Sequence, residues 1–356
     1  MDKAFLVLEN GQCFPARGHG CKKDTIGELV FTNAVCGIAA ELTDAVSFGQ
    51  IMLATFPLTG NCGVGAGELE ARGAAVGFVA RELCEQPSNF SSLCTADEFL
   101  QSKGISAVSG VDTRNIARIL TKEGTMNAGI FFGSEPQSLD AIKAYRVTGA
   151  VQAMSVKRAY TVPSNGQALY NVAVIDCGCG TRLAQALAQY GCEVKVYPYN
   201  VTAGELKAAG YNGVAVSQGG GSPYDCEGII STLRELGEGM PMLGVGLGHQ
   251  LMALAAGAQC IKLPYGHRGS NHPVVCSGRN RTYITSQNHG WAVNGDTLKG
   301  AAVTMYSADD GTCEGLEYAS GRAVSSQFFP ELSAGVQNTA FILERFISMM
   351  GGGFNA

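Results

Sequence analysis

The second half of the chain alternates apolar runs with helix-forming segments, and this alternation restricts the possible folds more than any other feature. Strand-like runs recur across residues 165–350, among them NVAVID (171–176), GVAVSQ (213–218) and PMLGVG (241–246). Strands that alternate with helices are typical of βαβ units, whose strands lie parallel in one sheet. The pattern predicts a doubly wound α/β domain.

The helices of this domain are recognised by their apolar periodicity and by their terminal residues. Thr202 is expected to be an N-cap, because its hydroxyl can accept a hydrogen bond from a free backbone N–H of the first helical turn. Short strands before the last helix predict a β-rich insertion. The expected helices cover residues 181–191, 202–210, 226–239 and 338–350.

The first 150 residues have another pattern, with strand-like runs at 4–11 and 27–33 and a helical segment at 112–124. They predict a separate N-terminal α/β domain. The segment that follows is polar and carries Pro163 and Gly166, as linkers often do. The predicted organisation is an N-terminal domain (1–150), a linker (151–168) and a doubly wound domain (169–356).

Composition excludes several classes of function. The 356 residues carry a formal net charge of −5 without runs of like charge, so neither nucleic acid nor a membrane surface is expected as a partner. The start of the chain has no signal-peptide pattern, and no apolar run reaches the ~18 residues of a membrane span. We therefore expect a cytoplasmic protein.

The thirteen cysteines are scattered and odd in number, which predicts mostly free thiols. Two groupings could suggest metal ligands. Cys177 and Cys179 flank one residue, and His267, His272 and Cys276 lie within ten positions, but neither spacing matches a known metal-binding pattern. No metal is predicted.

The stretch PMLGVGLGHQLMALAAGA (241–258) places Gly246 where a strand turns sharply into a helix. Hydrolytic α/β enzymes hold a nucleophile at such a turn, over a helix N-terminus whose N–H groups can bind an oxyanion. Glycine tolerates the strained turn but supplies no nucleophile. A dinucleotide-binding loop is not favoured either, because His249 occupies the third glycine position and no acidic residue follows at the required distance. No cofactor is therefore predicted, and His249 is interpreted as a structural residue.

Several motifs together resemble a known family. GVGLGHQLMALAAGA, LPYGHRGSNHPV, ITSQNHGWAV and SQFFPELSAG are similar to successive motifs of the class I glutamine amidotransferase domain. In the first half, LVLENGQCFPARGHG, TIGELVF, FPLTGNCGV and SGVDTRNIARILTKEGTM resemble segments of the carbamoyl-phosphate synthetase small subunit, in the same order. The resemblance covers nearly the whole chain and implies the N-terminal domain of that subunit followed by an amidotransferase domain.

The resemblance implies a Cys-His-Glu triad that hydrolyses glutamine and delivers ammonia to a large synthetase subunit. This chain has Gly246 at the cysteine position and Phe329 at the histidine position, and it retains Glu331. Without a nucleophile and a base, hydrolysis should be negligible. We expect a pseudoenzyme subunit within a heteromer.

The positions that bind glutamine in the family are only partly kept. Ala34 replaces a serine, and SQGGGSP replaces the usual Ser-Asn-Gly-Pro-Gly-Asp-Pro loop, so glutamine binding should be weakened. A structural interpretation stays open for Gln250, Asn288, Gly290 and Glu331, and is preferred for Arg268 and His272. The expected glutamine-binding positions are Ala34, Gly219, Gly221, Leu247, Gln250, Asn288, Gly290 and Trp291.

Three functional hypotheses follow. The leading one is a small subunit whose large partner makes carbamoyl phosphate from ATP, bicarbonate and free ammonia. The others are a non-catalytic glutamine-binding regulatory module and an active subunit with a replaced nucleophile. The chain has no GxxxxGK[ST] loop, so ATP chemistry would belong to the partner. Whether the product enters pyrimidine or arginine biosynthesis stays open.

Overall fold

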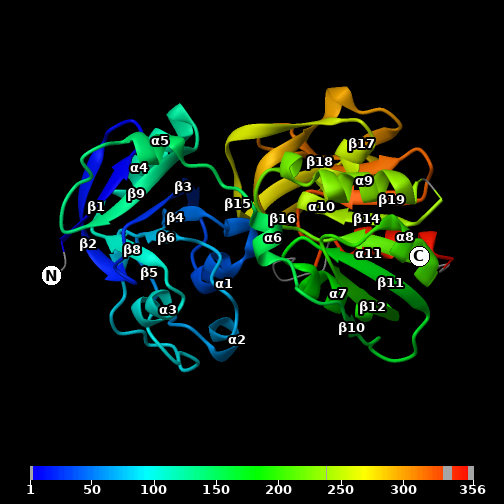
Figure 1. Cartoon of the computed structure of the whole chain (residues 1–356), viewed down its shortest axis with the longest axis horizontal. Helices are drawn as coiled ribbons and strands as arrows, with labels where there is room; N and C mark the ends of the chain where they lie inside the picture. Colours follow the sequence, from blue (N-terminus) through cyan, green and yellow to red (C-terminus); the bar gives the residue numbers. More distant parts are fainter. Residues whose placement is uncertain (1–2, 238, 332–338, 352–356) are drawn as a thin grey trace. The chain divides into compact units, whose positions relative to one another are not determined.

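The strand-like runs of the second half form one large sheet in the computed structural model, which describes residues 3–237, 239–331 and 339–351. The chain divides into two compact units, Met1–Thr148 and Gly149–Ala356 (Figure 1). Residue 238 and residues 332–338, which include parts of two predicted helices and of the motif SQFFPELSAG, lie outside the described residues.

The sheet of the C-terminal unit has ten strands in the order β10-β12-β11-β13-β14-β19-β18-β16-β15-β17. The pairs from β12 through β11, β13 and β14 to β19 are parallel, which confirms the doubly wound prediction. The strands are β10 (Tyr160–Val162), β11 (Tyr170–Asp176), β12 (Cys192–Pro198), β13 (Gly213–Val216), β14 (Met242–Val245), β15 (Gln259–Cys276), β16 (Arg281–Asn294), β17 (Ala301–Ser307), β18 (Cys313–Tyr318) and β19 (Ala323–Ser326).

Helices follow the parallel strands as the sequence predicts. Buried side chains of α8, α9 and α10 share one hydrophobic cluster with β11 and β13, so these helices pack on the same face of the sheet. Thr202 caps α8: its Oγ1 accepts a hydrogen bond from the N–H of Glu205, and Glu205 Oε2 accepts one from the N–H of Thr202. The helices are α7 (Gly180–Ala188), α8 (Ala203–Ala209), α9 (Glu227–Leu236), α10 (Leu247–Ala255) and α11 (Phe341–Met349).

The predicted β-rich insertion is the antiparallel part of the sheet, in which β15 and β16 form a long ribbon. The predicted linker is different in the structure. Residues 149–168 group with the C-terminal unit, because α6 (Ala150–Met154) lies there and β10 pairs with β12 as an antiparallel edge strand. The polar composition of residues 151–168 is compatible with an exposed edge strand as well as with a linker, and local sequence does not distinguish the two.

The N-terminal unit is a closed barrel with strand order β1-β2-β8-β6-β4-β3-β9. Leu6 and Leu8 of β1 belong to the cluster shared by the barrel strands, whereas Phe5 and Val7 pack with Ile142 of α5. Both faces of β1 are therefore covered, which explains its unbroken apolar run. The strands are β1 (Lys3–Leu8), β2 (Cys13–Gly20), β3 (Thr25–Thr32), β4 (Gln50–Ala54), β6 (Gly77–Val79), β8 (Ser106–Ser109) and β9 (Met126–Phe132).

Smaller elements surround the barrel strands. They are the pair β5 (Leu58–Thr59) and β7 (Glu82–Leu83) and the helices α1 (Ile38–Thr43), α2 (Ala66–Leu69), α3 (Ala96–Ser102), α4 (Thr113–Glu123) and α5 (Asp140–Ala144). None of the helices in the described part of the chain has the length and apolarity that crossing a bilayer requires.

Glycines let α10 approach the sheet closely. A Cβ on Gly248 would lie 2.2 Å from the carbonyl oxygen of Val216 in β13, and one on Gly244 would lie 2.7 Å from the carbonyl oxygen of Gly248. Backbone atoms cannot rotate away as a side chain can, so any larger residue must push the helix off the strands.

We predict that Gly248→Ala lowers the free energy of unfolding by about 3 kcal/mol, at the upper end of the usual overpacking cost. Gly228→Ala is the matched control, since Gly228 lies exposed on α9 with no atom near the added Cβ. Urea unfolding followed by circular dichroism measures both variants. Equal midpoints would show that α10 is not held as closely as described.

Candidate functional site

The turn from β14 into α10 has the strained geometry expected of a nucleophile position. Gly246 has φ 58° and ψ −113°, a region that residues with a Cβ rarely adopt. Its N–H donates to the carbonyl oxygen of Ser326 (2.9 Å), and its own carbonyl oxygen accepts from the N–H of Gln250 (3.3 Å). The structure contains the predicted strand, turn and helix, with a glycine at the position where a nucleophile is expected.

The structure brings the three predicted triad positions together around a fourth residue, Gln218. A Cβ built on Gly246 would lie 2.7 Å from Gln218 Cβ and 3.4 Å from Phe329 Cε1. Gln218 Nε2 donates to Glu331 Oε1 at 2.9 Å. Gln218 therefore occupies part of the space that a nucleophilic side chain at position 246 would need. The carboxylate of Glu331 accepts a hydrogen bond from the amide of Gln218, where the family's glutamate would bind an imidazole.

Phe329 is buried and its backbone is held, since its N–H donates to the carbonyl oxygen of Ser286 on β16 (3.2 Å). A phenyl ring neither accepts nor donates a proton. In this arrangement Gly246 offers no nucleophilic atom, and Phe329 offers no base at the position next to it.

Gln250 and Trp291, two expected glutamine-binding residues, meet directly. Gln250 Nε2 donates to the carbonyl oxygen of Trp291 (2.9 Å) and to Gln327 Oε1 (3.0 Å). Both amide hydrogens of Gln250 are thus used within the protein. Trp291 also packs edge-on against Tyr224, with ring centroids 5.8 Å apart.

The glycines of the loop after β13 are required by their surroundings. A Cβ on Gly219 would lie 2.2 Å from the carbonyl oxygen of Cys177, and Gly221 has φ +88°. Leu247 is buried at the start of α10. Gly290 on β16 faces Arg268, whose Nη2 would lie 3.2 Å from an added Cβ, and Asn288 lies opposite Arg268 in the β15–β16 register.

Ala34 is the one expected glutamine-binding position outside the C-terminal unit. It follows β3 in the N-terminal unit, where its N–H donates to Thr32 Oγ1 (3.2 Å). Its methyl group supplies no hydrogen bond to a ligand.

His249 lies fully buried on α10, and its Nδ1 is 2.8 Å from Ser325 Oγ. Burial lowers the pKa of its imidazole to about 3. The side chain is therefore neutral at physiological pH and held in the core, in keeping with a structural role.

All thirteen cysteines are free, as predicted, and those from Cys177 onward are buried. Burial raises the pKa of Cys226 and Cys260 to about 12 and that of Cys177 well above its ordinary value. At neutral pH these groups are thiols, which are poor nucleophiles compared with thiolates.

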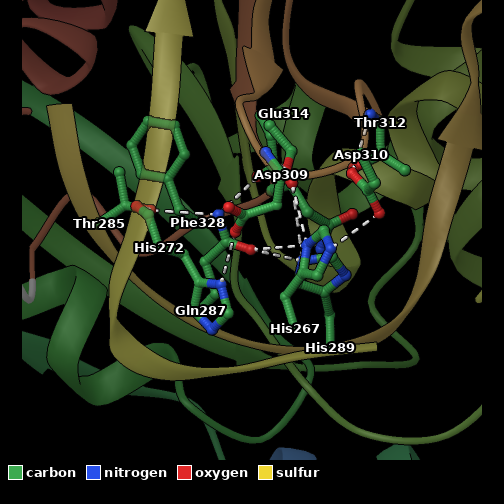
Figure 2. Close-up of polar contacts among 12 residues, drawn as sticks. His267, His272, Thr285, Gln287, His289, Asp309, Asp310, Thr312, Glu314 and Phe328 are labelled. Atoms are coloured by element: carbon green, nitrogen blue, oxygen red, sulfur yellow. Dashed lines mark hydrogen bonds and ion pairs between the residues drawn. The ribbon is translucent and has the colours of Figure 1, made fainter. Parts of the chain in front are cut away.

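The potential metal ligands that lie together in the structure differ from those grouped by sequence spacing. The ligand atoms of His267, His289 and Glu314 all lie within 4.8 Å of one another, whereas His272 and Cys276, grouped with His267 by their spacing, are not members of this cluster. Figure 2 shows the cluster with its polar neighbours. The sequence does not point to His289 and Glu314, because they lie on other strands, far from His267 along the chain.

Gln218 is the functional position that the residue-level prediction missed. Its signal was present, because SQGGGSP has glutamine where the family loop has asparagine. The contact with Gly246 and the hydrogen bond to Glu331 depend on three distant segments, so sequence spacing could not reveal them.

Comparison with known proteins identifies relatives of both units. The model of the "Glutamine amidotransferase class-I" family matches residues 173–349, and that of "Carbamoyl-phosphate synthase small chain, CPSase domain" matches residues 6–130. These matches confirm the predicted fold class and the family resemblance.

Curated relatives extend over the whole chain. A carbamoyl phosphate synthase small chain of Listeria monocytogenes serotype 4b (strain F2365) is 38% identical over 359 residues, covering 99% of this chain and 98% of the relative. A carbamoyl phosphate synthase pyrimidine-specific small chain of Lactiplantibacillus plantarum is 36% identical, covering 98% and 96%. A solved structure of a putative GMP synthase subunit from Thermoplasma acidophilum covers 51% of this chain and 94% of its own, with 21% identity and a TM-score of 0.46.

The buried neutral His249 predicts a specific loss of stability in acid. Its pKa is lowered from 6.5 to about 3 on folding, so below pH 6.5 the unfolded chain binds a proton that the folded chain does not. The free energy of unfolding should fall as pH decreases, with a contribution from His249 of up to about 1.4 kcal/mol per pH unit.

His249→Gln should remove this contribution and flatten the dependence between pH 6 and pH 5, measured by urea unfolding. Above pH 7 the two proteins should have parallel profiles, because His249 is neutral in both states there. Identical slopes below pH 6 would show that His249 is not buried as a neutral group.

Proposed function

This chain belongs to the family of carbamoyl phosphate synthase small chains, and on that premise we propose that it is a small chain whose amidotransferase site does not hydrolyse glutamine. It would associate with a large chain that forms carbamoyl phosphate from ATP, bicarbonate and free ammonia. The observation that carries the proposal is the strained turn at Gly246, which faces Phe329 and has no nucleophile.

The chemistry of an intact site explains why both losses matter. A cysteine thiolate attacks the carboxamide of glutamine, a histidine transfers the proton to the departing ammonia, and a carboxylate orients the histidine. Here Gly246 supplies no attacking atom and Phe329 transfers no proton. Glu331 accepts a hydrogen bond from Gln218 and so has another partner.

A replaced nucleophile receives no support from the buried thiols of the C-terminal unit. Cys260, whose Sγ lies 3.9 Å from the carbonyl oxygen of Gln250, is buried, and burial raises its pKa to about 12. A thiol of that pKa at neutral pH is almost wholly protonated. Loss of the nucleophile from comparable triads reduces turnover by on the order of 10⁶.

Glutamine binding without hydrolysis is the other open function. Two loop glycines at family pocket positions, Gly219 and Gly221, are kept, and this supports a pocket of the family's shape. The amide hydrogens of Gln250, however, are already engaged within the protein. We therefore expect this chain to bind glutamine weakly or not at all. Isothermal calorimetry with glutamine distinguishes this from a regulatory glutamine site, which would release heat without forming ammonia.

The decisive test is carbamoyl phosphate formation by the complex of this chain with its cognate large chain. We predict product with ammonium and no product above background with glutamine at the same ATP and bicarbonate concentrations. The large chain alone and a complex containing an intact small chain are the controls. Product from glutamine would contradict the proposal, and failure of the two chains to co-purify would remove the partner role.

Restoring the missing groups tests whether Gln218 also blocks the site. We predict that Gly246→Cys with Phe329→His regains less glutaminase activity than the same pair combined with Gln218→Gly. The third change removes the Cβ that would lie 2.7 Å from the new cysteine and frees Glu331 for the histidine.

Gly228→Cys in the otherwise unchanged chain is the control for a new exposed thiol, since Gly228 lies on the outer surface of α9. Released ammonia is measured at saturating glutamine. Equal activity of the double and triple variants would show that the backbone at Gln218 moves aside without cost.

A further inference from the structure

A second polar cluster lies in the antiparallel part of the C-terminal sheet, separate from the Gly246 turn. His267 on β15 is directly opposite His289 on β16, and their rings meet edge to face with centroids 4.9 Å apart. Glu314 reaches them from β18 and is fully buried (Figure 2). A buried carboxylate is costly unless it is fully paired or coordinates a metal ion.

Four potential ligand atoms converge in this cluster. Glu314 Oε1 lies 3.4 Å from His267 Nδ1 and 3.8 Å from His289 Nε2, and Gln287 Oε1 lies 3.0 Å and 2.9 Å from the same two nitrogens. With metal–ligand distances of about 2.0–2.1 Å, the edge of a zinc tetrahedron is about 3.3 Å. The observed separations lie on either side of that value.

The outer nitrogens of both histidines have the partners typical of metal-bound imidazoles. His289 Nδ1 lies 2.9 Å from the carbonyl oxygen of Trp291, and His267 Nε2 lies 3.0 Å from Asp310 Oδ2. Carbonyl and carboxylate groups in this position fix the ring tautomer and direct the other nitrogen to the metal. His289 must carry its proton on Nδ1, because a carbonyl oxygen only accepts.

The amide of Gln287 is oriented by Thr285. Thr285 Oγ1 donates its proton to the carbonyl oxygen of His272 (2.9 Å), so it can only accept from Gln287 Nε2 (3.1 Å). Gln287 Nε2 also donates to Glu314 Oε2 at 3.1 Å. These contacts require Gln287 Oε1 to face the histidines.

In the centre of the cluster, hydrogen-bond acceptors therefore face one another without a proton between them. The lone pair of a neutral His289 on Nε2 meets Gln287 Oε1 at 2.9 Å. Both ring nitrogens of His289 face an acceptor oxygen, so a neutral ring leaves one of these two contacts unsatisfied. Glu314 Oε1 lies 3.4 Å from His267 Nδ1 but accepts no well-formed hydrogen bond from the residues that the structure describes.

Protonation of His267 does not resolve the conflict. Its Nδ1 would then donate to Gln287 Oε1, yet His289 Nε2 would still face that oxygen with a lone pair. A cation placed among the four atoms satisfies every lone pair at once.

We propose that His267 Nδ1, His289 Nε2, Glu314 Oε1 and Gln287 Oε1 form a tetrahedral site for Zn²⁺. Two imidazoles and two oxygens suit zinc, and four protein ligands leave no open position, so the site is structural. The ion would join β15, β16 and β18, and Glu314 together with Asp310 would balance its charge. The proposal is independent of the loss of glutamine hydrolysis.

The test uses the full chain, stripped with a chelator and reloaded with either Zn²⁺ or Co²⁺. We expect close to one zinc ion per chain by elemental analysis after gel filtration, and a higher unfolding temperature with zinc than without. The Co²⁺ form should have the intense visible absorption of tetrahedral coordination, without a thiolate charge-transfer band. Loss of all zinc on gel filtration with an octahedral Co²⁺ spectrum would overturn the proposal.

Two variants identify the ligands. Glu314→Gln keeps the side-chain shape and should weaken zinc binding at least tenfold in competition with a chromophoric chelator. Cys276→Ser, which changes a buried residue outside the group of ligands, should bind zinc as the unchanged chain does. Equal zinc affinity of Glu314→Gln and the unchanged chain, or loss of binding in Cys276→Ser, would contradict the assignment. The Co²⁺ spectrum of the unchanged chain decides the question if Glu314→Gln does not fold.

Discussion

The close packing of α10 against the parallel strands constrains the turn on which the candidate site is built. Gly244 and Gly248 let the helix backbone approach β13 and β14 to distances that no Cβ could occupy. The chain must then pass from strand to helix within one residue, and Gly246 adopts the strained conformation that this requires. The sharp turn at Gly246 follows from the position of α10. The turn is therefore present although position 246 carries no nucleophile.

Ordinary protein contacts fill the space around Gly246. Phe329 is buried beside the elbow, Gln218 narrows the space above Gly246 and binds Glu331, and Gln250 bonds to the backbone of Trp291. The Nε2 atoms of Gln218 and Gln250 both donate to groups within the protein. A buried polar group without a partner is costly, so these hydrogen bonds stabilise the arrangement around Gly246.

Much of the fold was predictable because it depends on local patterns. The apolar periods of β11, β13 and β14 and the cap of α8 at Thr202 are local and are found in the structure as expected. The barrel of the N-terminal unit and the edge strand β10 were not predicted, because strand pairing is decided by partners distant in sequence. The composition of residues 160–162 and their surroundings is compatible with either a linker or an edge strand.

The sequence by itself is enough to predict the doubly wound domain. It also predicts a strand-to-helix turn without a nucleophile or a base, since residue identity alone decides whether a side chain can attack or transfer a proton. Other features exist only in the folded chain. The meeting of Gln218 with Glu331 and the convergence of His267, His289 and Glu314 join segments that are far apart in the sequence. Such contacts depend on strand order and register, which packing of the complete chain establishes.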